Sequence, residues 1–153
     1  MRRSVMEFFT PSLVRKSQSA RFTSRDWLSV ESSYRSHLAE LWPAIPRSVR
    51  LLSRHYFHDC TILRIEFVEP DTVSIWLKGF KNFRSGKKSV PGIHRITFKR
   101  VAQTNLGLEH LSACWSYEEI DWEDNAAELR VLLSDGKQFF LRFRVVTVET
   151  NRE

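Results

Sequence analysis

The pattern of hydrophobic and polar residues changes its period near residue 60, and the two periods predict two kinds of structure. Before that point, hydrophobic residues recur at spacings of three and four, as on one face of a helix: Trp27, Val30, Tyr34, Leu38 and Leu41. Thr23 can cap this helix, Asp26 places negative charge in its first turn, and the prolines after Leu41 end it. A second, shorter helix is predicted from about Pro46 to Arg54, which makes residues 23–54 helical.

From Thr61 onward the period becomes two, which is typical of half-buried strands. In the first predicted hairpin, the residues expected to face inward are Leu63, Ile65 and Phe67 on one strand and Val73, Ile75 and Leu77 on the other. The polar segment 81–92 is expected to form an exposed loop, and residues 102–113 are irregular. Four further strands are predicted at Ile93–Val101, Cys114–Trp122, Leu129–Leu133 and Phe139–Val148.

This order of elements predicts one α+β domain over residues 1–153. Two N-terminal helices would pack on a mostly antiparallel sheet of about six strands at residues 61–149. Residues 1–22 are expected to form a short element, with Phe8 and Phe9 as an anchor, followed by a flexible segment. Exposed strand edges are compatible with a monomer or a homodimer.

Composition narrows the class of protein. Hydrophobic residues make up 42% of the chain and aromatic residues 12%, which is enough for a substantial core. No apolar run is long enough to span a bilayer and no signal-peptide core follows the basic start, so we expect a cytoplasmic protein without membrane contact. In that compartment Cys60 and Cys114 are expected to be reduced thiols, and no motif indicates a cofactor.

The distribution of charge is more informative than the net charge of +6. Residues 78–100 contain eight basic side chains and no acidic one, whereas residues 109–135 contain eight acidic side chains and one basic one, Arg130. The two segments either lie side by side and neutralise each other or form two poles of the surface.

The run from Arg54 to Cys60 concentrates several chemically capable side chains just before the first long strand. His58 and Asp59 are expected to form a structural polar motif that hydrogen-bonds the backbone where helix gives way to strand. The alternative is a metal-dependent hydrolase site at His55, His58 and Asp59, because imidazole titrates near neutrality and a carboxylate can orient it. A zinc site needs at least a third ligand, and the other histidines stand alone in the sequence.

The two charged segments offer two candidate interfaces. The basic one can contact anions or nucleic acid through Lys81, Arg84, Lys87 and Lys88, with Phe80 and Phe83 available for stacking on bases. The acidic one mixes aromatic and charged residues, as interaction hot spots do, and its predicted partner-binding residues are Trp115, Tyr117, Glu118, Glu119, Asp121 and Trp122.

Four short segments carry a resemblance to a group of small bacterial proteins of unknown function. They are Met6-Glu7-Phe8-Phe9-Thr10, the helix end near Leu41 before Pro46, Phe57-His58-Asp59, and Trp115-Ser116-Tyr117-Glu118-Glu119-Ile120. The resemblance implies an N-terminal helical part, a Leu/Phe-His-Asp motif and a β-rich remainder. It also implies a role as an immunity protein, which binds and blocks a cognate toxin, and it supplies no catalytic residues.

We therefore predict a non-enzymatic protein-binding module, with a toxin as the partner if the immunity role holds. A nucleic-acid-binding protein that uses residues 78–100 is the first alternative, and the metal-dependent hydrolase described above is the second.

Overall fold

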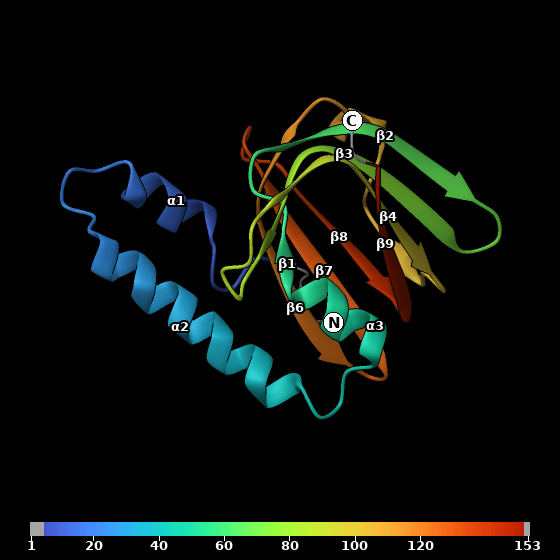
Figure 1. Ribbon diagram of the computed structural model, residues 1–153, viewed down its shortest axis with the longest axis horizontal. Coiled ribbons are helices and arrows are strands. Elements are labelled where there is room, and N and C mark those ends of the chain that lie inside the picture. Colours follow the sequence, from blue (N-terminus) through green and yellow to red (C-terminus); the bar gives the residue numbers. More distant parts are fainter. Residues whose placement is uncertain (1–4, 152–153) are drawn as a thin grey trace.

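The computed structural model describes residues 5–151, in which three α-helices precede a large antiparallel sheet (Figure 1). The helices are α1 (Pro11–Ser17), α2 (Ser24–Leu41) and α3 (Arg47–Ser53). The strands are β1 (His55–Tyr56), β2 (Cys60–Val68), β3 (Thr72–Phe83), β4 (Val90–Lys99), β5 (Gln103–Thr104), β6 (Cys114–Glu123), β7 (Ala126–Leu133), β8 (Gln138–Phe143) and β9 (Val145–Asn151), with a 3-10 turn at Leu108–His110. The α+β class is confirmed, but two helices and six strands were too few, because the described residues form three helices and nine strands.

One extra strand arises because the predicted strand 139–148 bends at Arg144. β8 pairs with β7 near one end of the sheet, while β9 pairs with β4 at the other end, in the order β5-β8-β7-β6-β2-β3-β4-β9. Since a single residue joins β8 to β9, the sheet curls until its two ends meet at this corner. Phe98 and Phe143, from opposite ends of the strand order, pack edge to face with ring centroids 4.9 Å apart.

The β3–β4 hairpin is longer than predicted, so residues 81–92 do not all form a loop. The pairing of β3 with β4 continues as far as Lys81 and Val90, and β1 pairs with the last residues of β3. Gly79 is required within this extension, because it adopts a φ of +148° and a Cβ there would lie 2.8 Å from Cys60 Sγ. The polar composition of the segment therefore reflects a mostly half-buried ribbon as well as the exposed turn at residues 85–88.

The predicted inward face of β2 is wrong in part. A register shift between Ile62 and Arg64 places Ile62 in the core, while Leu63 and Phe67 are 45% and 50% exposed. Such an irregularity moves the flanking side chains to the other face of the sheet. On β3 the prediction is confirmed, with Val73, Ile75 and Leu77 all buried.

The helical part packs against the core through the predicted faces. The Thr23–Asp26 capping box begins α2, Tyr34 and Leu38 are buried, and α3 buries Val49 and Leu52. Residues 6–9 are also packed on the core, since Met6 and Phe9 are only 5% exposed, and Thr10 caps α1, which buries none of its own residues. Among the helices of residues 5–151, none combines the length and hydrophobicity needed to cross a membrane.

Helix α2 covers an edge that the sheet leaves open. Among the described residues, β6 pairs with β2 only at Cys60–Trp115 and Thr61–Cys114, so that none of their strands neighbours this edge of β6 beyond Ser116. The hydroxyl of Tyr34, on α2, accepts a hydrogen bond of 2.8 Å from the Ile120 N–H on that edge. This opening, bridged by α2, borders the candidate site.

Candidate functional site

A cleft of about 360 Å³ lies where α2, β1, β6, the segment just before α1 and the turn of the β3–β4 hairpin meet. Figure 1 shows this hairpin turn reaching from the sheet toward α1 and α2. We call this site the aromatic cleft, and its lining residues are Phe9, Trp27, Glu31, Arg35, Tyr56, His58, Phe83, Arg84, Gly86, Ser116, Tyr117 and Glu118. Its volume falls within the range of ligand-binding pockets, and an apolar lining with a few convergent polar groups is typical of such sites.

Tyr117 organises the aromatic wall of the cleft. Its ring stacks on Phe9 at a centroid distance of 5.1 Å and on Trp27 at 5.5 Å, and the imidazole of His58 lies 5.2 Å away. Contacts from three separate segments of the chain therefore hold the ring of Tyr117 in place. Burial raises the pKa of its hydroxyl, which stays protonated and can donate a hydrogen bond into the cleft.

Arg84 places a cation in the cleft and is held in position from several sides. Its Nε donates a 2.9 Å hydrogen bond to the carbonyl of Ser53, and its guanidinium lies 5.1 Å and 5.6 Å from the ring centroids of Tyr34 and Tyr56. No ion pair joins Arg84 to another residue of the described part of the chain. Arg35, exposed on α2, is the second arginine of the lining.

Glu118 is the buried carboxyl of the cleft. Its two oxygens accept hydrogen bonds from the Phe57 N–H at 3.2 Å and from the Trp115 indole Nε1–H at 3.1 Å. Burial raises the pKa of Glu118, and Arg84 opposes that shift only in part. The lining also holds a second carboxyl group, that of Glu31, which is exposed on α2.

His58 lines the cleft, whereas His55 and Asp59 point elsewhere. His58 Nδ1 lies 2.6 Å from the carbonyl oxygen of Ser116, which can only accept, so this nitrogen carries the proton. His58 Nε2 is 3.5 Å from a carboxylate oxygen of Asp59, whose side chain is 82% exposed. The ring of His55 packs edge to face on Phe83, and burial, with lesser effects of Lys81 and Arg54, lowers its pKa to about 4.

The three residues of the predicted metal site are therefore not brought together. Within residues 5–151, no group of three or more His, Cys, Asp or Glu side chains is placed to hold a metal ion. His58 instead hydrogen-bonds the backbone carbonyl of Ser116 and forms part of the cleft wall.

The acidic strand is mostly buried, which corrects the prediction of a partner-binding surface there. Trp115, Glu118, Glu119 and Asp121 are each at most 7% exposed, and Trp122 is half-buried. Of the six predicted residues, the cleft is lined by Tyr117 and Glu118. A partner protein cannot contact these buried side chains directly.

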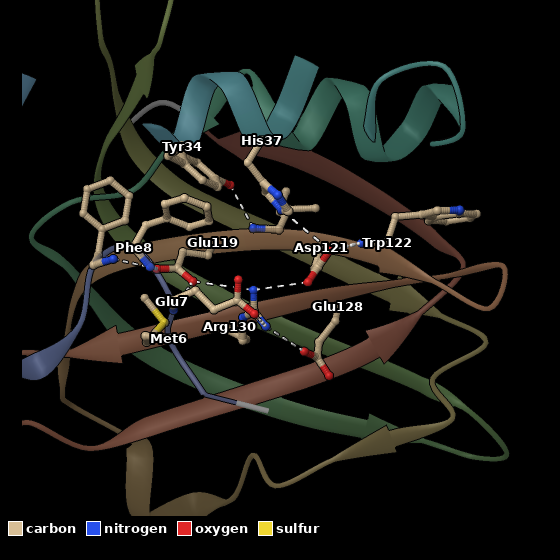
Figure 2. A network of polar contacts seen from close by, with 12 residues as sticks. Met6, Glu7, Phe8, Tyr34, His37, Glu119, Asp121, Trp122, Glu128 and Arg130 are labelled. Carbon is tan, nitrogen blue, oxygen red and sulfur yellow. Dashed lines mark hydrogen bonds and ion pairs between the residues drawn. The ribbon is translucent and has the colours of Figure 1, made fainter. Parts of the chain in front are cut away.

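Glu119 and Arg130 form the centre of a buried polar network, shown in Figure 2. The Glu119 carboxylate accepts hydrogen bonds from three successive backbone amides, those of Glu7, Phe8 and Phe9, at 2.6–2.8 Å. Arg130 lies opposite Glu119 on β7, and its guanidinium is 3.3–3.7 Å from carboxylate oxygens of Glu7, Glu119, Asp121 and Glu128.

This network fixes the N-terminal segment on the sheet, and so it sets one wall of the aromatic cleft. The three amides that Glu119 binds lead directly into Phe9, which lies against Tyr117. Arg130 is the single basic residue of the acidic segment. This isolated positive charge is the feature of the sequence that could have indicated a buried counter-ion for the carboxylates. Arg130 thus pairs with acidic side chains of its own segment, while Arg84 of the basic segment lies near enough to Glu118 to oppose the rise of its pKa.

The basic hairpin is the more exposed of the two predicted interfaces. Lys87 and Lys88 are exposed in its turn, and Lys81 and Arg84 are half-buried. Lys81 and Lys87 place their ammonium groups 5.6 Å and 6.0 Å from the ring centroid of Phe83. The four predicted anion contacts thus lie around one turn, and Arg84 enters the cleft from it.

Comparisons with known proteins give a family but no activity. The family model described as "Protein of unknown function (DUF4085)" matches residues 7–140. The crystal structure of an uncharacterized protein from Neisseria gonorrhoeae is similar at a TM-score of 0.42 and 12% sequence identity, over 63% of this chain and 96% of that chain. No curated protein matches the sequence.

Proposed function

The chain belongs to DUF4085, a family of unknown function, and from the geometry of the aromatic cleft we propose that it is a non-enzymatic protein-binding module. In this proposal the cleft receives an acidic side chain of a partner protein. The observation that carries it is Arg84, a cation held between two tyrosine rings and a backbone carbonyl inside a cleft. Arginine in such a fixed position is well suited to bind a carboxylate through two hydrogen bonds.

Three further features support recognition of an acidic partner. Arg35 gives the cleft a second guanidinium, and Lys87 and Lys88 extend positive charge over the adjoining turn. Positive potential around a binding site speeds encounter with negatively charged proteins. The aromatic rings of the lining supply area for apolar contacts, as in hot spots of protein interfaces.

The immunity role implied by the resemblance is the specific form of this proposal. In that form the partner is a toxin, and the acidic side chain that enters the cleft belongs to the toxin's surface. Blocking would follow from covering that surface, so the protein itself needs no chemistry of its own.

The proposal is tested by selecting peptides with the immobilised full-length protein from a phage-displayed library of random linear peptides. We expect the bound peptides to be enriched in Asp and Glu, and Arg84→Ala to weaken binding of a synthetic selected peptide by about tenfold or more. Arg47→Ala, on α3 outside the cleft lining, is the matched control and should leave affinity unchanged. Selected peptides without acidic residues, or no selection at all, would contradict the proposal.

A second candidate, nucleic-acid binding, is favoured by a different observation. On the outer face of the sheet, Trp76 lies between Arg64 and Arg95, with its ring centroid 4.7 Å and 5.9 Å from their guanidiniums, although each arginine also has a carboxylate partner. Lys78 and the 54%-exposed Phe80 lie further along the same strand. A single-stranded RNA homopolymer retained in a gel shift at low salt, and released by Trp76→Ala, would support it. Absence of a shift at low salt would remove this candidate.

A further inference from the structure

A second cavity, of about 430 Å³, adjoins the aromatic cleft on the α3 side of Arg84. We call it the Trp42 cavity, and it is lined by Arg35, Leu38, Ala39, Trp42, Ser53, Arg54 and Arg84. The indole of Trp42 is fixed in place, because the guanidiniums of Arg50 and Arg54 lie 5.5 Å and 5.7 Å from its ring. Arg50 also donates hydrogen bonds of 2.7 Å and 3.0 Å to the carbonyl of Trp42.

The two cavities share the two arginines of the proposed acidic subsite. Arg35 and Arg84 line both of them, so these two side chains lie where the cleft and the Trp42 cavity adjoin. The chemistry on the two sides differs. The cleft adds His58, Tyr117 and Glu118, whereas the Trp42 cavity adds the apolar surfaces of Leu38, Ala39 and the Trp42 ring.

We infer that the partner segment carries an apolar side chain next to its acidic residue, and that this side chain fills the Trp42 cavity. The inference rests on the proposed function, since it assumes an acidic residue at Arg84. A carboxylate bound between Arg35 and Arg84 places the flanking residues of its own chain at the mouths of both cavities. The cationic rim formed by Arg35, Arg54 and Arg84 excludes a basic side chain there, while the indole and Leu38 favour an aliphatic or aromatic one.

The partner motif is therefore an acidic residue with a large apolar residue at a fixed spacing. Each feature has a separate physical origin, because the acidic residue is selected by charge and the apolar one by burial against Trp42 and Leu38. A variant can consequently lose the apolar preference and keep the acidic one, and the experiment tests for this separation.

The same random peptide library is selected in parallel on the unchanged protein and on three variants. Ala39→Gln introduces a larger, uncharged side chain at an exposed position of α2 and narrows the Trp42 cavity without altering charge. Trp42→Ala removes the indole, and circular dichroism checks that both variants fold. Ser36→Gln, at an exposed position of the same helix outside both cavities, is the matched control.

On the unchanged protein and on Ser36→Gln, we expect peptides with an acidic residue and an apolar residue at one preferred spacing. On Ala39→Gln and on Trp42→Ala, the acidic preference should remain while the apolar preference disappears. Affinity for a synthetic peptide with both residues should fall by about tenfold for Ala39→Gln, to the level of the same peptide with Ala at the apolar position.

Two results would overturn the inference while leaving the proposed function intact. One is an acidic preference on the unchanged protein with no apolar residue at a fixed spacing. The other is an apolar preference that Ala39→Gln leaves unaltered, because the apolar side chain would then bind elsewhere. Loss of the acidic preference itself would instead contradict the proposed function, so the two failures are distinguishable.

Discussion

The acidic strand β6 and the basic β3–β4 hairpin carry charges of opposite sign, and the fold also treats these charges in opposite ways. Glu119 and Asp121 are buried, while Lys87 and Lys88 are exposed at a turn. The difference follows from what the fold provides for each charge. The Glu119 carboxylate receives three amide hydrogen bonds and faces Arg130, and such partners offset the cost of burying a charge.

The comparison teaches that a run of charge in a sequence does not by itself identify an interface. The buried charges of β6 serve the scaffold, and they affect binding indirectly by holding Phe9 against Tyr117. The hairpin supplies the free surface and the Arg84 cation. The aromatic cleft lies where these two regions meet, with Arg84 from the hairpin near Glu118 from the strand.

The largest expected effect is on stability, and it tests whether the buried charge of Glu119 on β6 holds the fold together. Replacing Glu119 by Gln would remove the charge and turn one acceptor oxygen into a donor that faces backbone N–H groups. We expect the free energy of unfolding, measured in urea at neutral pH, to fall by about 3 kcal/mol or more. Glu40→Gln, at an exposed position of α2, should change it by no more than about 0.5 kcal/mol. Equal stability of the two variants would show that Glu119 does not anchor the N-terminal segment.

The next effect concerns the open edge of β6 that α2 covers. Tyr34→Phe removes the hydroxyl that accepts the Ile120 N–H and leaves this buried donor without its partner. We expect a loss of about 1–2 kcal/mol in urea unfolding, together with faster hydrogen exchange at the Ile120 amide. An unchanged exchange rate would mean that the edge is protected by something other than the tyrosine hydroxyl.

Features with local causes were predictable from the sequence. The capping box at Thr23 and the burial of Tyr34 and Leu38 depend on residues within a few turns of one helix. The inward face of β3 follows the alternation in the same way. These elements agree with the prediction because near neighbours in the chain determine them.

Features with distant causes were not predictable. Nothing near Arg144 in the sequence indicates that β8 and β9 pair at opposite ends of the sheet, because the chain stays extended through the bend. Similarly, Arg84, His58 and Tyr117 were each singled out, but for different surfaces. Their convergence in one cleft depends on how α2 and the hairpin pack on β6, which no local pattern records.

A smaller effect arises from the imidazoles beside the basic hairpin. Burial, with lesser effects of Lys81 and Arg54, lowers the pKa of His55 from 6.5 to about 4, and burial also lowers the pKa of His94. Between pH 6.5 and 4 the unfolded chain therefore binds more protons at these sites than the folded protein. Stability should rise with pH through this window and be lost as the pH falls.

For His55 this contribution should be about 1 kcal/mol, since its partial exposure weakens the effect. His55→Gln should flatten the pH dependence of urea unfolding between pH 4 and 6.5, and the NMR titration of the His55 ring should have its midpoint near pH 4. A midpoint near 6.5 would show that neither burial nor the positive charge of Lys81 and Arg54 is felt at this ring.

The smallest effect on stability is expected where the proposed effect on binding is clearest. Lys87→Ala combined with Lys88→Ala should change the free energy of unfolding by less than about 0.5 kcal/mol, because both side chains are exposed. The same change should slow association with a selected acidic peptide a few-fold at low salt and reduce the salt dependence of that rate, since steering depends on surface charge.

Arg15→Ala combined with Lys16→Ala removes equal charge from α1, outside the cleft lining, and should slow association less. If both double variants slow association equally, only the net charge of the protein attracts the peptide. In that case the binding data would not favour the β3–β4 hairpin over the buried strand β6 as the interface.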